Sequence, residues 1–132
     1  MVIVSRHGVR SPTGKIEKLN EYSAQPWPAW IVPPGYLTGH NAKLMTIFDA
    51  YNRELLVRQG LLTDKDCRDA AHITIVADSD QRTRETGKAL ASGLMPNCLP
   101  EVQALPEDTL NPLFHPLAAA KSWQIRMWLQ PL

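Results

Sequence analysis

The sequence lacks the features that mark several large classes of protein. No run approaches the about 18 consecutive apolar residues that a membrane-spanning helix needs, so no membrane association is expected. The 14 basic and 13 acidic residues are interspersed and leave a formal net charge of +1, which argues against a nucleic-acid binder. Neither of the two cysteines lies in a Cys-x-x-Cys pair, so no zinc site or redox motif is expected. Function must therefore come from local motifs.

One such motif stands near the amino terminus. The stretch Arg6-His7-Gly8-Val9-Arg10-Ser11-Pro12 follows the β-branched run Val2-Ile3-Val4, which predicts a buried strand of a parallel sheet. Ligands of such sheets bind at the carboxyl ends of the strands. Arginine donates bidentate, charge-assisted hydrogen bonds to phosphoryl oxygens, and a neutral imidazole beside it can attack the phosphorus. The motif predicts a phosphate site with His7 as nucleophile; an isolated Arg-His pair on the surface is the plainer alternative.

A second arginine cluster follows another predicted strand. The run 73–77 is rich in β-branched residues and ends just before Asp78-Ser79-Asp80-Gln81-Arg82. Because this cluster also lies at a strand's carboxyl end, Arg82 can converge with the first motif. The residues alone leave open whether Arg82 binds phosphate or is a solvated helix residue.

The periodicity of the remaining chain predicts two helices. Thr38 is a suitable N-cap for a helix that ends at Gly60, and its core stripe is expected to consist of Leu44, Ile47, Phe48, Tyr51 and Leu55. Asp78 or Asp80 can cap a second helix that Pro96 stops, with Thr86, Ala89, Leu90 and Leu94 on one face. With a further strand at 101–105, the order of elements predicts βαβ connections and an α/β fold with a parallel sheet.

The other segments carry weaker signals. Residues 11–34 are rich in proline and predict a long loop without secondary structure, anchored by Trp27 and Trp30 and lying over the motif. The histidines at 40, 72 and 115 are expected to be surface or capping residues, since none is spaced for metal binding. For residues 118–132 an amphipathic helix is the default expectation.

The motif resembles the signature Arg-His-Gly-x-Arg-x-Pro of the histidine acid phosphatases at every fixed position. The stretch 2–116 is similar to the bacterial periplasmic phytases and glucose-1-phosphatases, through Trp27-Pro28-Ala29-Trp30, Gly35-Tyr36-Leu37-Thr38 and Gly60-Leu61-Leu62. The resemblance implies about the first third of a phosphoglycerate-mutase-like histidine phosphatase domain. Residues 1–117 would form the amino-terminal part of that domain, and 118–132 a divergent tail.

The same resemblance implies roles for individual residues. His7 would become phosphorylated, Arg6, Arg10 and Arg82 would bind the transferred phosphate, and Thr13 and Asp78 would contact the substrate. That substrate would be a small phosphomonoester such as phytate or a sugar phosphate, and neither a cofactor nor a metal is implied.

Two departures from the family pattern stand out. The family's proton donor lies in a His-Asp pair, and no His-Asp dipeptide occurs in this sequence. Lysine commonly follows the threonine of the motif loop, whereas Gly14 follows Thr13 here. Two hypotheses therefore remain: a phytase-like acid phosphatase that is inactive as this fragment, and a truncated, non-catalytic remnant that at most binds phosphate.

The two cysteines are Cys67 and Cys98. A bond between them would close a loop of about thirty residues, worth roughly 3 to 4 kcal/mol in the chain-entropy model. Their spacing alone leaves two unpaired thiols as the alternative. The resemblance implies that they pair and that the location is periplasmic. Strand-like sequence from Met1 onward predicts no signal peptide within this chain.

Overall fold

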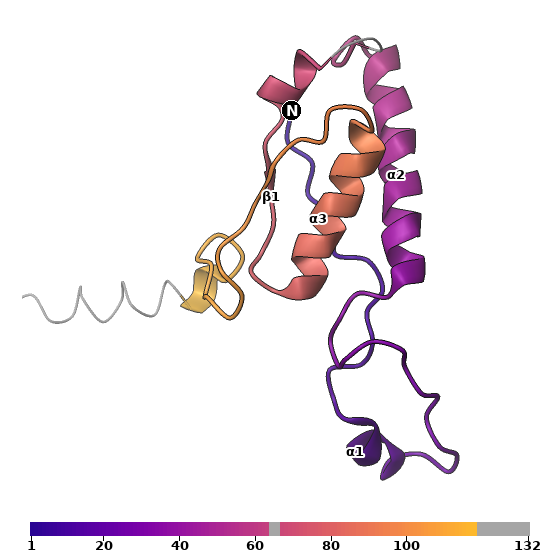
Figure 1. Ribbon diagram of the computed structural model, residues 1–132. Coiled ribbons are helices and arrows are strands. Elements are labelled where there is room, and N and C mark those ends of the chain that lie inside the picture. Colours follow the sequence, from indigo (N-terminus) through magenta and orange to yellow (C-terminus); the bar gives the residue numbers. More distant parts are fainter. Residues whose placement is uncertain (64–66, 119–132) are drawn as a thin grey trace, which may run out of the picture.

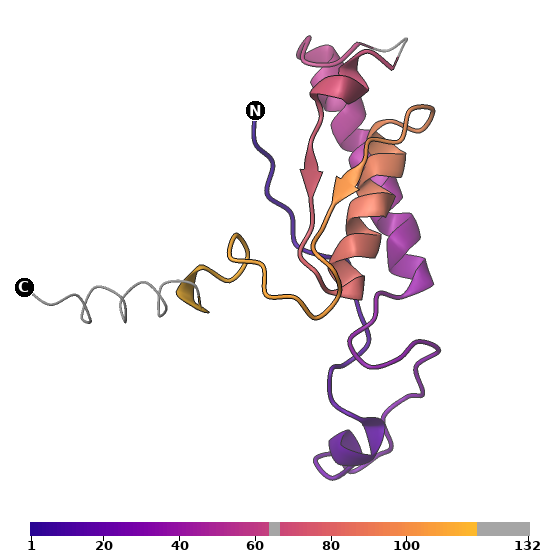
Figure 2. The same cartoon turned by 60° about the vertical axis from the view of Figure 1, so that its left-hand side comes forward.

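The computed structural model describes residues 1–63 and 67–118. Two helices and a small sheet form three adjacent layers, with α3 lying between α2 and the strands (Figures 1 and 2). In chain order the elements are α1 (Ile16–Asn20), α2 (Gly39–Arg58), the 3₁₀-helix η1 (Asp69–His72), β1 (Ile75–Val76), α3 (Gln81–Leu94) and β2 (Val102–Gln103).

The sheet is a parallel pair. Ile75 of β1 lies opposite Val102 of β2, and α3 connects the two strands. This βαβ unit confirms the predicted α/β class with a parallel sheet, although both strands are shorter than predicted. The Ala77 amide continues the pairing by donating to the Gln103 carbonyl at 2.8 Å.

The predicted strand at residues 2–4 does not form. The segment runs beside β1 (Figure 2), but no strand pairing is found for it within the described residues. Val2, Ile3 and Val4 are all exposed. A strand needs the hydrogen bonds of a partner, and β-branched sequence alone does not provide them.

Helix α2 begins and ends as predicted. The Thr38 hydroxyl accepts a hydrogen bond from the Asn41 amide at 3.4 Å, which confirms the N-cap. At the other end Gly60 has φ +70°. That conformation, which strains residues with a Cβ, lets the Leu61 amide donate to the Leu56 carbonyl at 2.9 Å.

The predicted core stripe of α2 is wrong. Its five members are 37–65% exposed: Leu44, Ile47, Phe48, Tyr51 and Leu55. The helix packs on α3 through another face, where a Cβ on Gly93 would lie 2.1 Å from the Thr46 carbonyl oxygen. Close approach of the two backbones at small residues outweighs apolar periodicity here.

Helix α3 confirms the predicted helix before Pro96, and Thr86, Ala89 and Leu94 are buried as expected. The predicted carboxylate cap is wrong. Asp80 occupies the N-cap position, but its side chain makes no capping hydrogen bond and pairs with Arg82 instead. The Thr83 hydroxyl donates to the Asp80 carbonyl at 2.7 Å, which anchors the first turn.

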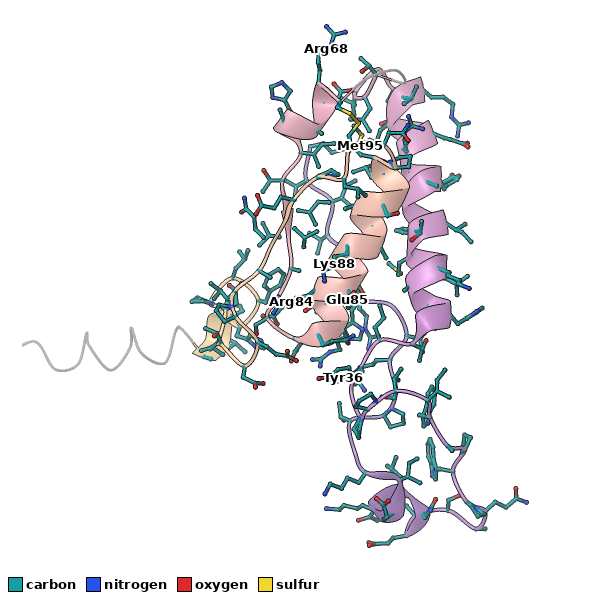
Figure 3. All side chains as sticks on the ribbon, viewed as in Figure 1. Tyr36, Arg68, Arg84, Glu85, Lys88 and Met95 are labelled. Atoms are coloured by element: carbon teal, nitrogen blue, oxygen red, sulfur yellow. A yellow bond between two sulfur atoms is a disulfide. The ribbon has the colours of Figure 1, made fainter. Side chains whose placement is uncertain are left out.

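The apolar core lies at the end of the helix pair remote from the motif. Leu56, Leu94 and Met95 are buried together there. The Cys67–Cys98 disulfide closes this end, with 5.4 Å between the two Cα atoms, and Figure 3 shows it close to Met95. The pairing that the resemblance implied is thereby confirmed.

The long loop at 11–34 differs from the prediction in two respects. It contains a short helix, α1, and it projects beyond the amino-terminal end of α2 (Figure 1), so that none of its residues lines the hollow at the motif. Trp27 and Trp30 remain partly exposed, and Trp30 lines an open hollow of about 290 Å³ with Lys15 and Pro34. The hollow beside Trp30 is therefore lined by residues of the loop itself.

The remaining features concern the carboxyl-terminal tail, membrane-spanning helices and metal-binding clusters. Apart from Ala118, the predicted tail at 118–132 lies outside the described residues. Within the described ranges, no helix combines the length and apolar character needed to cross a membrane. Residues 1–63 and 67–118 also contain no cluster of three or more histidine, cysteine or carboxylate groups that could hold a metal ion.

Candidate active site

The motif backbone is pressed against both long helices at Gly8. The Gly8 amide donates to the Thr86 hydroxyl of α3 at 3.1 Å. A Cβ at this position would lie 3.0 Å from side-chain atoms of both Leu37 and Met45, so these side chains would have to shift to accept a larger residue. The position of Gly8 therefore fixes the backbone from which the neighbouring motif side chains extend.

His7 has a defined tautomer. Its Nδ1 lies 2.7 Å from the Gly8 carbonyl oxygen, and because a carbonyl only accepts, Nδ1 carries the proton. In the neutral ring the lone pair is then on Nε2. His7 is partly buried and lines an open hollow of about 270 Å³ with Arg6, Gly8, Val9 and Arg10. In the neutral ring the unprotonated nitrogen of His7 is thus Nε2, and His7 shares this hollow with Arg6 and Arg10.

Arg10 is tied to the segment that precedes α2. It forms an antiparallel bridge with Leu37, and its Nη1 donates to the Ser11 carbonyl at 2.9 Å. The Ser11 amide donates to the Tyr36 carbonyl at 3.0 Å, and its hydroxyl to the Pro33 carbonyl at 2.6 Å. Arg6, by contrast, is exposed.

Arg82 reaches the same segment from α3. Its Nη1 lies 3.9 Å from the Cβ position of Gly35, and Oε1 of the neighbouring Gln81 accepts from the Leu37 amide at 3.0 Å. Tyr36 lies just beyond the amino-terminal end of α3 (Figure 3). Residues 35–37 therefore run between Arg10 and Arg82, although Arg82 is not among the residues that line the hollow at His7.

Both arginines have unused donors. The Nε atoms of Arg10 and Arg82 are buried and have no hydrogen-bond partner within the described part of the chain. A buried donor on a charged group without an acceptor is unfavourable.

The two predicted substrate contacts lie on different sides of this arrangement. Thr13 is exposed, and its methyl carbon lies 3.6 Å from the Cβ position of Gly35, the residue that Arg82 also approaches. Asp78 is buried at the end of β1, where its Oδ2 lies 3.0 Å from Nε2 of His115.

Sequence reasoning missed several residues that position the motif. Thr86 was expected only on the buried helix face, and a polar residue on that face was the available signal for its bond to Gly8. Gln81 and Ser11 offered no signal in the sequence, because their side chains hydrogen-bond to backbone groups that only the fold brings close. His115 was expected to be a surface or capping residue; it is partly exposed, but its partner is the buried Asp78.

Comparisons with known proteins place the chain in a family. It is 42% identical over 118 residues to phytase AppA of Escherichia coli, covering 89% of this chain and 27% of that protein. It is 32% identical to glucose-1-phosphatase of Salmonella typhimurium, covering 96% and 31% of the two chains. The structure of Hafnia alvei phytase in complex with myo-inositol hexakis sulphate superposes with a TM-score of 0.75 at 36% identity, covering 86% and 28%.

The family model of the histidine phosphatase superfamily, branch 2, matches residues 1–130, and the chain belongs to this family. It spans only 27–31% of the length of the curated relatives it matches. The described structure is accordingly an incomplete α/β domain of the histidine phosphatase fold.

Proposed function

We propose that this chain carries the phosphate-binding half of an acid phosphatase that hydrolyses phosphomonoesters through a phosphohistidine at His7. The observation that carries the proposal is the His7 tautomer, because the Gly8 carbonyl occupies Nδ1 and leaves the Nε2 lone pair for attack. The family membership supports the phosphatase class.

The arginines and His7 divide the chemistry. Nε2 of His7 would bond to phosphorus while the bond from phosphorus to the ester oxygen breaks, and water would later release phosphate from the imidazole. Arg6, Arg10 and Arg82 would stabilise the charge on the equatorial oxygens. The unpartnered Nε atoms of Arg10 and Arg82 support this assignment.

The leaving alkoxide also needs a proton. General acid catalysis of this kind is typically worth 10²- to 10⁴-fold, and this sequence has no His-Asp dipeptide to supply it. We therefore expect little turnover from the 132-residue chain, even where it binds phosphate. A non-catalytic, phosphate-binding remnant is the second candidate, favoured by the share of the relatives that the chain spans.

The proposed class of substrate is inferred from the names of the relatives. One relative is named a phytase and another a glucose-1-phosphatase, so a small phosphomonoester such as phytate or a sugar phosphate is proposed. Thr13 and Asp78 would contact it, Asp78 through the organic group that the phosphate esterifies. We propose a periplasmic location, which the Cys67–Cys98 disulfide supports because such bonds persist in oxidising compartments. Neither a cofactor, a nucleic acid nor a membrane enters the proposal.

Trapping with labelled substrate tests the nucleophile. The chain would be mixed with a ³²P-labelled aryl phosphate near pH 5, quenched, and analysed for acid-labile, base-stable label. We expect label on His7, none in His7→Ala, and unchanged labelling in His40→Ala, whose histidine is exposed at the start of α2. Label on another residue type would contradict the assignment. Steady-state turnover at the rate of a full-length relative would contradict the expectation that this chain turns over slowly for want of a proton donor.

A further inference from the structure

Asp78 is a buried carboxylate four residues before Arg82, one of the arginines proposed to bind phosphate. It lies two positions after the end of β1 and precedes α3, whose first turn carries Arg82. A carboxylate in this turn raises an electrostatic problem. It would repel an incoming phosphate, or it would bind the Arg82 guanidinium that the phosphate requires.

The structure gives this carboxylate a partner other than Arg82. Asp78 Oδ1 accepts from the Ser79 amide at 2.8 Å, and Oδ2 lies 3.0 Å from Nε2 of His115. Arg82 pairs with the more exposed Asp80. The more exposed carboxylate of Asp80 is thus paired with an arginine, and the buried carboxylate of Asp78 with a histidine.

The loop that presents His115 is ordered by its own hydrogen bonds. The His115 and Phe114 amides donate to the Asn111 carbonyl at 3.0 and 3.1 Å, and the Asn111 side-chain oxygen accepts from the Leu113 amide at 3.0 Å. Asn111 is buried. The His115 side chain is 47% exposed, while that of Asp78 is 10% exposed. The imidazole therefore covers the carboxylate from the solvent side.

We propose that His115 is a positioning residue for the phosphate site, and this inference rests on the proposed function. Its imidazole pairs with Asp78 and holds that carboxylate away from Arg82. Without His115, Asp78 competes with phosphate for the arginine that stands four residues later in the same strand-to-helix turn. His115 touches neither the phosphate nor His7 in this account.

Binding of inorganic phosphate to the 132-residue chain tests the proposal. Calorimetric titration would compare wild type, His115→Ala, and His115→Ala combined with Asp78→Asn. We expect His115→Ala to weaken phosphate binding about tenfold and the second substitution to restore most of it. His40→Ala is the matched control, and circular dichroism checks that helices persist; His115→Gln replaces any His115→Ala protein that loses helicity.

The rescue separates electrostatic positioning from a purely structural role. Binding by His115→Ala as tight as wild type overturns the proposal but leaves the arginine site standing. Weakened binding that Asp78→Asn does not restore also overturns it, since loss of packing would not be repaired by removing a charge. A wild-type chain that binds no phosphate refutes the proposed function itself, and this inference with it.

A spectroscopic readout tests the pair without phosphate. At neutral pH, long-range ¹H–¹⁵N spectra report which ring nitrogen of His115 carries the proton. We expect the Nε2–H tautomer in wild type, because Nε2 faces the carboxylate, and a loss of that preference in Asp78→Asn. A Nδ1–H tautomer in wild type would show that the pair is absent and would overturn the proposal.

Discussion

The two faces of helix α2 differ sharply in how they are covered. Toward α3 the helices approach so closely that Gly93 leaves no room for a Cβ, and Leu56 and Asp49 are buried. On the other face the stripe formed by Leu44, Ile47, Phe48, Tyr51 and Leu55 is exposed. The face toward α3 is therefore covered by residues of this chain.

The exposed stripe shows that apolar periodicity identifies a helix face suited to burial but does not identify the element that buries it. The chain spans 27–31% of its curated relatives, so much of a related domain has no counterpart in it. We expect the stripe to be covered where more of the domain is present. Alone, the chain is expected to associate through this face.

Removing the disulfide should weaken the covered face most. Cys67 and Cys98 join the segment after α2 to the end of α3, with a sequence separation of 31. The double substitution to alanine is expected to lower the free energy of unfolding by roughly 3 to 4 kcal/mol, because the unfolded chain regains its freedom. Urea titration measures this, with reduced wild type as the control; a difference below about 1 kcal/mol would contradict it.

Gly93→Ala should break the same face directly. The added Cβ would overlap the Thr46 carbonyl, so the helices must separate, at a cost of roughly 1 to 3 kcal/mol. Gly39→Ala is the matched control, since a Cβ there meets nothing within 4 Å. Equal urea midpoints for the two variants would show that the close approach of the helices is not required.

Polar substitution of the exposed stripe should change association more than stability. We expect Ile47→Gln, Phe48→Gln and Tyr51→Gln together to weaken self-association by roughly tenfold or more, because burying each apolar side chain is worth about 1.5 to 3 kcal/mol. Sedimentation equilibrium measures it. The control replaces three exposed apolar residues outside the stripe, Ile31, Leu113 and Leu117, and association lost equally in both proteins would disprove a role for α2.

The smallest effect is expected at Asp49, the buried carboxylate of α2. Burial raises the pKa of Asp49 above its ordinary value of 3.8, although the Asn52 amide donates to it at 2.7 Å. The folded state therefore binds the proton more tightly than the unfolded state, and the free energy of unfolding falls as pH rises through the raised pKa. Relative to Asp49→Asn, wild type should lose stability above about pH 4; parallel pH profiles in urea would contradict this.

Local chemistry determined much of this protein from sequence. The N-cap of α2, the ends of α2 and α3, the parallel βαβ unit and the resemblance to histidine acid phosphatases all follow from neighbouring residues. Thr38 and Gly60 act on their own helix ends, so their effect can be predicted without knowing the rest of the fold. The assignment of His7, Arg6, Arg10, Arg82, Thr13 and Asp78 to one site stays a prediction.

Only the tertiary structure decided what depends on partners distant in sequence. The segment 2–4 forms no strand because a ladder needs a second chain segment, and the α2 stripe is exposed because α3 packs against another face of that helix. His115 meets Asp78 across 37 positions, and residues 35–37 run between Arg10 and Arg82. Such contacts follow from chain geometry, which propensity and periodicity do not encode.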